Sequence, residues 1–346
     1  MSEAALLSAP GEVARKTLRV AHLQRRPFPG YFSIEGQFEE LRAHMPEGIA
    51  CRPWICPHLS RGALPRIANT LAARRVRADV YHVTGDVHYL SLGLPRERTL
   101  LTIHDCVFAT QTRGLRRWAL RKTFYERAVA HAARVTVISE TVRRELLQLV
   151  PAAVEKVSVV PCCLPQRFTY SPKEFASVPE VLLVGTTPNK NLPRALEALK
   201  GLTCRIHVVG RLDAAQQAAL AATGAKWRNS IDLKGEAMVS AYREADVVAL
   251  LSTYEGFGLP IIEAQAVGRV VVASNTSSLP EASGGAAILV DPLDVAAISA
   301  GFARAMGDSA LRSELLERGR LNAARFAPAL VAQSYAALYE VLNQAP

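Results

Sequence analysis

The chain has 346 residues, enough for about two domains of ordinary size, and its 49% hydrophobic content is typical of a globular protein with a sizeable core. No run of about 18 apolar residues occurs, so we expect no transmembrane helix. The net charge is +10, but aromatic residues make up only 6% of the chain and no nucleic-acid-binding motif accompanies the charge, so we expect no nucleic acid partner.

The positive charge is concentrated in the first half of the chain. Residues 1–170 hold 25 Lys and Arg against 14 Asp and Glu, a net of +11, whereas residues 171–346 hold 16 against 17. A basic domain attracts phosphate groups and anionic membranes, so we expect a membrane surface or a phosphate-bearing ligand at the first half. The alternative is that the arginines reflect a GC-rich genome and bind no ligand.

The cysteines and the amino-terminal residues indicate the cellular compartment of the protein. The six cysteines form no Cys-x-x-Cys pair, which argues against a zinc site or a disulfide framework. Residues 1–17 mix charged residues with short apolar pieces and lack the apolar core of a secretory signal. We therefore expect reduced thiols, a loose amino-terminal tail and a cytoplasmic location.

Apolar runs of strand length alternate with helical patterns along the chain. Near-continuous Val, Ile and Leu runs are typical of parallel strands that are buried on both faces. The expected strands are residues 18–23, 79–83, 99–103, 134–138, 157–161, 181–185, 205–210, 230–234, 246–252, 270–274 and 287–290. The expected helices include residues 139–149, 192–200, 238–243, 260–267 and 328–342.

Two such series of strands and helices predict two doubly wound α/β units. Residues 162–178 contain Pro165 and Pro172, are flanked by Pro161 and Pro179 and show no clear period, so the linker is expected there. We place the first domain at residues 1–168, the second at 169–327 and a final helical segment at 328–346. Ligands bind at the carboxyl ends of parallel strands, so the site is expected in the cleft between the two domains.

Residues 252–263, with the sequence STYEGFGLPIIE, are the most informative stretch of the chain. They follow an expected strand and lead into an expected helix, and Glu255 and Glu263 lie eight positions apart around a glycine turn. Gly256 and Gly258 allow the backbone to approach a ligand closely, and free N–H groups at a helix start attract an anion. This layout is typical of a site for a polyhydroxylated ligand with phosphate, such as a nucleotide sugar. The alternative is two surface glutamates on an ordinary Rossmann-like unit.

This stretch resembles the Glu-x7-Glu motif of the retaining glycosyltransferases of family 4, also called glycosyl transferases group 1. The likeness extends to residues 278–292, SLPEASGGAAILVDP, and to residues 181–191, VLLVGTTPNKN, and it covers the first half of the chain more loosely. The resemblance implies the GT-B fold, in which two Rossmann-like domains face a central cleft. It also implies that the first domain binds the acceptor, that the second binds the nucleotide-sugar donor, and that the final helix crosses back to the first domain.

The loop after residues 181–185 is expected to hold the diphosphate of the donor. Lys190 can place a positive charge on this leaving group. Members of the family usually have two basic residues in this loop, but Asn189 stands in one of these positions. One of the two charges is therefore missing or comes from elsewhere, with Arg194 and Arg211 as the candidates, and Arg211 directly follows an expected strand.

The two glutamates and the glycine turn complete the expected donor site. By resemblance, Glu263 binds the ribose hydroxyls, and Glu255 binds the donor sugar, where its charge can stabilise an oxocarbenium-like transition state. Residues 235–239 resemble the loop that surrounds the nucleobase. The expected donor-binding residues are Gly185, Thr186, Asn189, Lys190, Arg211, Gly256, Phe257, Gly258, Leu259 and Glu263.

Polar residues also follow the expected strands of the first domain. His104 resembles the family's histidine that contacts the donor sugar, so the expected catalytic residues are Glu255, His104 and Lys190. The arginines and aromatic residues of 25–33 favour a phosphate-containing, partly lipidic acceptor. The expected acceptor-binding residues are Arg25, Arg26, Asp86, His88 and Asp105, with ordinary loop positions as the alternative for Asp86 and His88.

Residues 113–127 interleave basic and apolar side chains, a pattern typical of an amphipathic helix that lies on anionic lipid. The alternative is a helix that packs its apolar stripe on its own sheet. We expect Trp118 to face lipid and Phe124 to face the sheet.

These features indicate a cytoplasmic hexosyltransferase, peripheral to the inner face of the membrane. It would move a hexose, with mannose as one candidate, from a GDP- or UDP-linked donor to a lipid-linked glycan of a bacterial surface polysaccharide, with retention implied by the resemblance. No cofactor or metal is expected, because a lysine and a helix start can neutralise the diphosphate and no Asp-x-Asp pair is present. A soluble enzyme with a small-molecule acceptor and a non-catalytic nucleotide-sugar-binding module remain open as alternatives.

Overall fold

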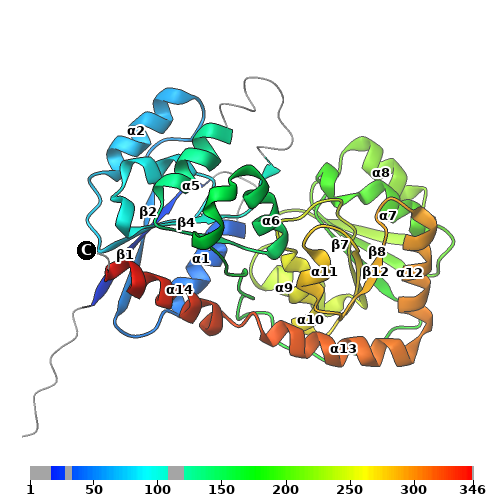
Figure 1. Cartoon of the computed structure of the whole chain (residues 1–346). Helices are drawn as coiled ribbons and strands as arrows, with labels where there is room; N and C mark the ends of the chain where they lie inside the picture. Colours follow the sequence, from blue (N-terminus) through cyan, green and yellow to red (C-terminus); the bar gives the residue numbers. More distant parts are fainter. Residues whose placement is uncertain (1–16, 28–32, 108–120, 345–346) are drawn as a thin grey trace, which may run out of the picture.

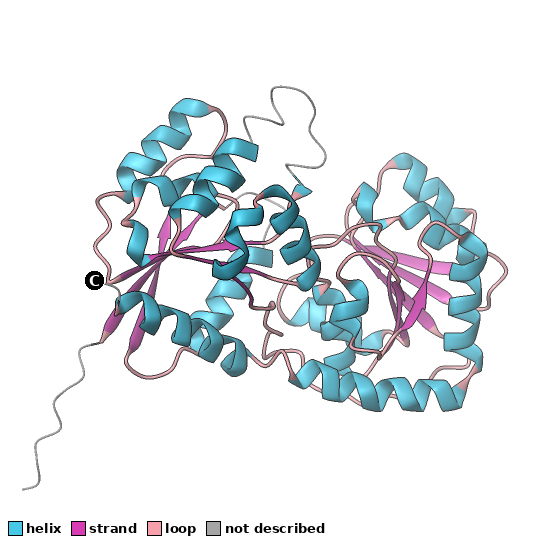
Figure 2. Ribbon diagram, viewed as in Figure 1, coloured by secondary structure: helices cyan, strands magenta, loops and turns pink. Residues whose placement is uncertain are grey.

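The computed structural model describes residues 17–27, 33–107 and 121–344. The described residues form two six-stranded sheets in which every strand pair is parallel. Helices cover both faces of each sheet (Figure 2). This arrangement confirms the predicted α/β class with two Rossmann-like units.

The first sheet has the strand order β2-β1-β3-β4-β5-β6. Its central strands are buried on both faces, which explains their nearly unbroken apolar sequences. The strands are β1 (Leu18–Gln24), β2 (Ile49–Ile55), β3 (Val80–Val83), β4 (Thr99–Ile103), β5 (Arg134–Val137) and β6 (Val157–Val159).

Short connections and helices surround this sheet. The helices are α1 (Ser33–Ala43), α2 (Ala63–Ala73), α5 (Arg127–His131) and α6 (Glu140–Leu149), with the 3-10 turns η1 (His88–Gly93), η2 (Arg96–Arg98) and η4 (Pro151–Lys156) and the π-helical turn η3 (Arg121–Glu126). Helix α6 begins after Ser139, whose hydroxyl accepts the backbone N–H of Val142 at 3.2 Å as an N-cap.

The second sheet has the order β12-β11-β10-β7-β8-β9. Its strands are β7 (Glu180–Val184), β8 (Arg205–Val209), β9 (Lys226–Ser230), β10 (Val247–Leu250), β11 (Val270–Ser274) and β12 (Ile288–Val290). Its helices are α7 (Leu192–Leu199), α8 (Ala214–Ala221), α9 (Glu236–Glu244), α10 (Leu259–Val267), α11 (Leu279–Ser283), α12 (Val295–Gly307) and α13 (Ser309–Ala324), with the turn η5 (Pro188–Lys190).

The final helix, α14 (Pro328–Asn343), leaves the second domain and packs against α1 and β3 of the first (Figure 1). Its buried Tyr339 bonds to His22 at 2.9 Å and to His82 at 2.7 Å, beneath the first sheet. None of the helices in the described part of the chain combines the length and the apolar character that a bilayer-spanning helix requires.

Three local expectations differ from the structure. Strand β2 was not predicted, because it lies at the sheet edge, contains Arg52 and Pro53, and has no buried residue, so it lacks an apolar run. The expected strand at residues 230–234 was placed too late, since the edge strand β9 ends at Ser230 and begins with exposed residues. The expected loop at residues 235–239 is mostly the start of α9, which follows Gly235 at a φ of 53°.

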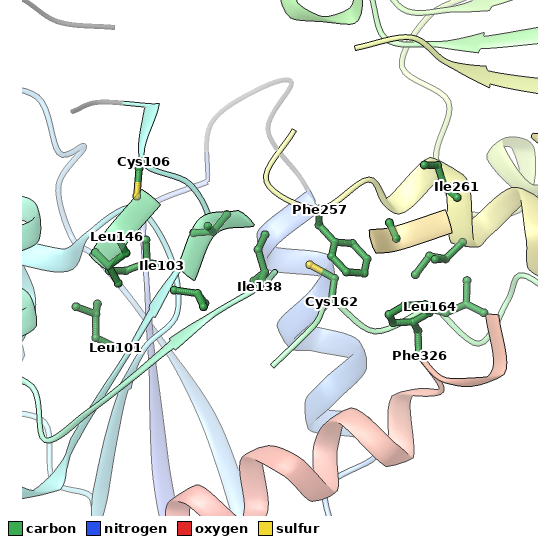
Figure 3. Packing of buried hydrophobic residues seen from close by; sticks show 14 of the residues in the cluster. Leu101, Ile103, Cys106, Ile138, Leu146, Cys162, Leu164, Phe257, Ile261 and Phe326 are labelled. Atoms are coloured by element: carbon green, nitrogen blue, oxygen red, sulfur yellow. The ribbon is translucent and has the colours of Figure 1, made fainter. Parts of the chain in front are cut away.

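One hydrophobic cluster continues from the first sheet into the second domain. Figure 3 shows its path from Ile138 through Cys162 to Phe257 and Phe326. The rings of Phe257 and Phe326 meet edge to face with their centroids 5.4 Å apart. The two domains are therefore joined by apolar packing as well as by the chain between β6 and β7.

Candidate functional site

Each sheet has one place where the strand order reverses, and the candidate site lies between these two places. In the first sheet the reversal falls between β1 and β3, and in the second between β7 and β10. Loops that leave such a pair of strands turn to opposite faces of the sheet and leave a crevice at its carboxyl edge. The loop that contains Lys190 follows β7, and the loop that contains Glu255 follows β10.

Lys190 and Glu255 meet in this crevice. The Lys190 Nζ donates to Glu255 Oε1 at 2.7 Å, and the Ser252 hydroxyl donates to the same oxygen at 2.7 Å. Both charged side chains are less than one fifth exposed, at 19% and 17%. Gly185 makes room for the lysine, because a Cβ at that position would lie 2.9 Å from Lys190 Cε. The crevice therefore holds a lysine whose charge is balanced by a carboxylate.

Two serines from the next loop fix the backbone around Glu255. The Ser277 hydroxyl donates to the Glu255 carbonyl at 2.6 Å and accepts the Glu255 N–H at 3.1 Å. The Ser278 hydroxyl lies 2.8 Å from the carbonyls of both Glu255 and Phe257. Gly258 has a φ of 113° and stands directly before α10, and both Gly258 and Leu259, the first residue of that helix, line the crevice.

Glu263 lies in the second turn of α10 and is half-buried. The hydroxyl of the buried Tyr242 donates to Glu263 Oε2 at 2.6 Å. Burial raises the pKa of the Glu263 carboxyl, while the bond from Tyr242 and the charges of Arg167 and Lys190 act in the opposite direction. One carboxylate oxygen is thus held in place by Tyr242.

His104 follows β4 and forms part of the wall from the first domain. Its Nε2 lies 2.9 Å from the Thr84 carbonyl, and because a carbonyl only accepts, this nitrogen carries the proton. Burial lowers the pKa of His104, which favours the neutral ring. The imidazole therefore presents Nδ1 as a hydrogen-bond acceptor. Asp105, the next residue, also lines the crevice, and burial together with the charge of Asp86 raises its pKa to about 6.

The crevice has a volume of about 250 Å³ and is lined by both domains. Its residues are Ile34, Gln37, His104, Asp105, Ile138 and Cys162 from the first part of the chain and Lys190, Glu255, Gly256, Phe257, Gly258 and Leu259 from the second. The structure thus brings together all three expected catalytic residues and Asp105 with four residues of the expected glycine turn.

The loop between β7 and α7 places the other expected donor residues. Asn189 donates to the Tyr254 carbonyl at 3.2 Å, and so it ties this loop to the Glu255 loop in place of supplying a second charge. The Thr186 hydroxyl donates to the Arg211 carbonyl at 2.7 Å, whereas the Arg211 side chain is exposed. Arg194 donates to the Asn191 side chain at 3.0 Å.

The expected acceptor residues separate into different environments. The Arg25 guanidinium pairs with Glu35 at 2.7 Å and with Asp86 at 2.6 Å, so two carboxylates already balance its charge. Arg26 is exposed and donates to the Pro57 carbonyl at 2.6 Å.

His88 lies in the core of the first domain and is not among the residues that line the crevice. Its Nδ1 lies 3.1 Å from the Phe124 carbonyl, and its ring packs edge to face on Phe124 and Tyr125. The turn η1 directs this side chain inward, which the loop-like sequence of residues 84–88 did not indicate.

Much of the expected basic helix at residues 113–127, including Trp118, lies outside the described residues. In its described part, Arg121 and Lys122 pair with Glu126 at 2.9 and 2.6 Å. Phe124 is buried, as expected for a residue that faces the sheet.

Contacts across the crevice were not predicted from the sequence. The Ser139 hydroxyl donates to the Gly256 carbonyl at 2.7 Å, and the Tyr254 hydroxyl donates to Glu145 at 2.8 Å. Both oxygens of Glu281 accept the Glu140 N–H, at 3.1 and 3.0 Å, so the start of α6 holds a carboxylate of the second domain. Their only sequence signal was the Ser-Glu start of α6, which is also an ordinary helix cap.

Two Rossmann-like domains that enclose a crevice with these side chains define the GT-B class of glycosyltransferases. A family model described as Glycosyltransferase Family 4 matches residues 24–165, and one described as Glycosyl transferases group 1 matches residues 178–308. The chain belongs to glycosyltransferase family 4 and is a glycosyltransferase.

Two curated relatives agree with this assignment, and a solved structure shares the fold. The chain is 29% identical over 280 residues to O-antigen chain mannosyltransferase B of Escherichia coli, covering 74% of this chain and 72% of that protein. It is 25% identical over 315 residues to the MMP alpha-(1->4)-mannosyltransferase of Mycolicibacterium hassiacum, covering 80% and 73%. Anabaena Alr3699/HepE in complex with UDP-glucose has the same fold, with a TM-score of 0.74, 14% identity and coverage of 93% of this chain and 99% of that one.

Proposed function

We propose that this glycosyltransferase moves a hexose from a GDP- or UDP-linked donor to an acceptor hydroxyl with retention of the anomeric configuration. The observation that carries the proposal is the Lys190–Glu255 pair beside the start of α10. The pair offers a positive charge for a diphosphate and a carboxylate for a sugar, within hydrogen-bond reach of each other. The similarity to two mannosyltransferases makes mannose the first sugar to test.

Donor binding begins with an exchange of partners at Lys190. The diphosphate replaces Glu255 as the partner of the lysine, and the backbone N–H groups of Gly258 and Leu259, at the start of α10, bind the phosphate oxygens. Glu255 then accepts hydrogen bonds from sugar hydroxyls while Ser252 keeps its carboxylate in place. Glu263, held by Tyr242, binds the ribose hydroxyls. No metal is part of this proposal: Lys190 supplies one full positive charge, and the start of α10 adds the partial positive charge of a helix N-terminus.

The acceptor hydroxyl approaches from the wall of the first domain. His104 accepts a hydrogen bond from the donor sugar at Nδ1, and Asp105 orients the acceptor. The leaving diphosphate takes the proton of the acceptor hydroxyl on the face where the bond to the sugar breaks. The proposed acceptor is a lipid-linked glycan of a bacterial surface polysaccharide, in keeping with the O-antigen relative.

A small-molecule acceptor is the second candidate, and one observation favours it. Arg25 was expected to bind an acceptor phosphate, but its charge is taken up by Glu35 and Asp86. The carboxylates beside Arg25 favour an acceptor with hydroxyl groups over one with phosphate.

A transfer assay with the purified full chain tests the proposal. GDP-mannose, UDP-glucose and related donors are supplied with a polyprenyl-diphosphate-linked glycan or with its water-soluble analogue. The product is identified by mass spectrometry, and its anomeric configuration is read by NMR. Transfer from one donor with retention is expected. An inverted product, or no transfer to either acceptor from any donor, would contradict the proposed function.

A further inference from the structure

Helix α2 exposes its large apolar side chains, and the residues that it does bury are small or polar. Leu64, Ile67 and Leu71 share one face of the helix and are 79%, 55% and 53% exposed. The buried residues of the helix are Asn69 and Ala73. A helix that packs on its own domain usually has the opposite arrangement, so this outward apolar face requires another explanation.

The exposed apolar face continues beyond the helix. Ile55 at the end of β2 and Leu59 in the next loop are also exposed, at 49% and 39%. Five of the fifteen large hydrophobic side chains that are exposed in the described chain thus fall within residues 55–71. We call these five, Ile55, Leu59, Leu64, Ile67 and Leu71, the apolar face.

Hydrogen bonds hold the apolar face in its outward orientation. The buried Asn69 side chain bonds to the N–H and the carbonyl of His58, at 3.0 and 2.9 Å, and to the Tyr89 hydroxyl at 3.0 Å. Ser60 also bonds to the Tyr89 hydroxyl, at 2.8 Å. The polar inner side of α2 is therefore fixed to the domain, and rotation of the helix to bury its leucines would break these bonds.

The charge around the apolar face has one sign. Residues 48–78 contain six arginines and no aspartate or glutamate. Arg52, Arg61, Arg74, Arg75 and Arg77 are exposed, whereas Arg66 packs its guanidinium over the Phe124 ring, 4.8 Å from the centroid. An apolar face with a cationic rim matches the interfacial region of a bilayer, where acyl chains lie beneath anionic headgroups.

A hydrogen bond and an ion pair connect the segment of the apolar face to the loops that follow β1 and β3. The Arg26 side chain, which follows β1, donates to the Pro57 carbonyl between Ile55 and Leu59. The neighbouring Arg25 pairs with Asp86 in the loop after β3. Figure 1 shows α2 on the part of the first domain that faces away from the second, so a flat surface can reach it without passing between the domains.

We propose that the apolar face of α2 and the arginines around it dock the first domain onto an anionic lipid bilayer. The protein then lies on the surface, with Leu64, Ile67 and Leu71 among the headgroups and the arginines at the phosphates. The inference deepens the proposed function, since it supplies a way to reach a lipid-linked acceptor, and it differs from the expected lipid contact of residues 113–127.

Sedimentation of the full chain with vesicles tests this docking. Vesicles of phosphatidylcholine with phosphatidylglycerol in equal parts are compared with vesicles of phosphatidylcholine alone. We expect binding to the anionic vesicles that weakens by about tenfold in Ile67→Glu and in Arg75→Glu and that falls steeply with added salt. The matched controls are Leu321→Glu, 58% exposed on α13, and Arg304→Glu on α12, which should bind like the unchanged protein.

Several outcomes would overturn the docking proposal. These are no sedimentation, equal sedimentation with neutral vesicles, or equal loss of binding in the control variants. A dimer in size-exclusion chromatography that Ile67→Glu dissociates would assign the apolar face to a second copy of the chain. The readout uses no donor, so a protein that binds vesicles but transfers no sugar would contradict the proposed function alone. A protein that transfers sugar but ignores vesicles would contradict the docking alone.

Discussion

The Ser139 hydroxyl donates to the carbonyl of Gly256 at 2.7 Å, and this bond joins the two walls of the crevice. The same serine caps α6, and the N–H of Glu140, the first residue of that helix, donates to Glu281 of the second domain. The start of α6 therefore acts at once as a helix terminus and as a contact between the domains. Because Gly256 is the neighbour of Glu255, a change in the distance between the domains should also change the geometry of the glycine turn.

Replacement of Ser139 by alanine should weaken both stability and catalysis. The variant loses an N-cap, worth about 1 kcal/mol, and a hydrogen bond between domains, worth about another 1 kcal/mol. Asp294→Ala is the control, because Asp294 caps α12 away from the crevice. Urea unfolding should show a loss in both variants, while kcat/KM should fall only in Ser139→Ala. Equal activity of the two variants would show that Ser139 does not support catalysis.

Gly256→Ala should block the approach of the domains. An alanine Cβ would lie 2.2 Å from the His104 carbonyl, so the two walls must separate to admit it. We expect a loss of activity of about a hundredfold, because misplacement by about 1 Å is enough for such an effect. The control is Gly307→Ala, where the added Cβ meets nothing within 4 Å. Small-angle scattering should report a more open shape, and unchanged kinetics would contradict the prediction.

Lys190→Ala should lower kcat/KM by about a hundredfold to a thousandfold, because the diphosphate loses its cation and Glu255 loses its partner. The fold should survive, since Ser252 still bonds to Glu255. Lys200→Ala removes a lysine from an exposed ion pair with Glu197 and should leave the kinetics unchanged. Steady-state kinetics of the two variants with the same donor checks the difference, and a similar effect in both would count against the site.

Acid should destabilise the protein through its buried histidines. Burial lowers the pKa of His22 to about 3 and that of His88 to about 4, below the ordinary value of 6.5. The unfolded chain then binds protons that the folded chain does not, so stability is complete above pH 6.5 and falls as the pH decreases below it. At pH 5 each of these two histidines should lower the free energy of unfolding by about 2 kcal/mol.

The raised pKa of Asp105 has the opposite effect, because it increases the stability of the folded protein as the pH falls. The contribution of a histidine is therefore best isolated by comparing the unchanged protein with His22→Asn. Urea unfolding of both proteins between pH 8 and pH 5 measures it. The variant should lose stability less steeply than the unchanged protein. Parallel curves would show that His22 does not titrate between the folded and unfolded states.

The sequence predicted the buried parts of the fold better than its edges. Strands β4 and β11 have the expected bounds because every residue of both is buried and most are apolar or β-branched. The edge strands β2 and β9 were missed or displaced, because exposure removes the apolar pattern. An edge strand is held by backbone hydrogen bonds to its one neighbouring strand, so its side chains do not need to be apolar.

The site was likewise predicted only in part. Lys190, Glu255 and His104 could be brought together from sequence because each follows a strand of a parallel sheet, and strand ends meet at one edge. The bond between Ser139 and Gly256 spans 117 positions and depends on how the domains meet, so no local pattern could indicate it. The exposure of the apolar face of α2 could not be predicted either. Its apolar residues have the spacing of an ordinary buried helix stripe, so the local pattern fits both arrangements.

The central claim is that Lys190 and Glu255 belong to a nucleotide-sugar donor site. The most direct test is the thermal stability of the unchanged protein and of Lys190→Ala with UDP, GDP, ADP and TDP. One of these should stabilise the unchanged protein by about 2.7 kcal/mol when present at 100 times its Kd, and it should stabilise Lys190→Ala much less. Stabilisation by none of the four, or equal stabilisation of both proteins, would contradict the claim.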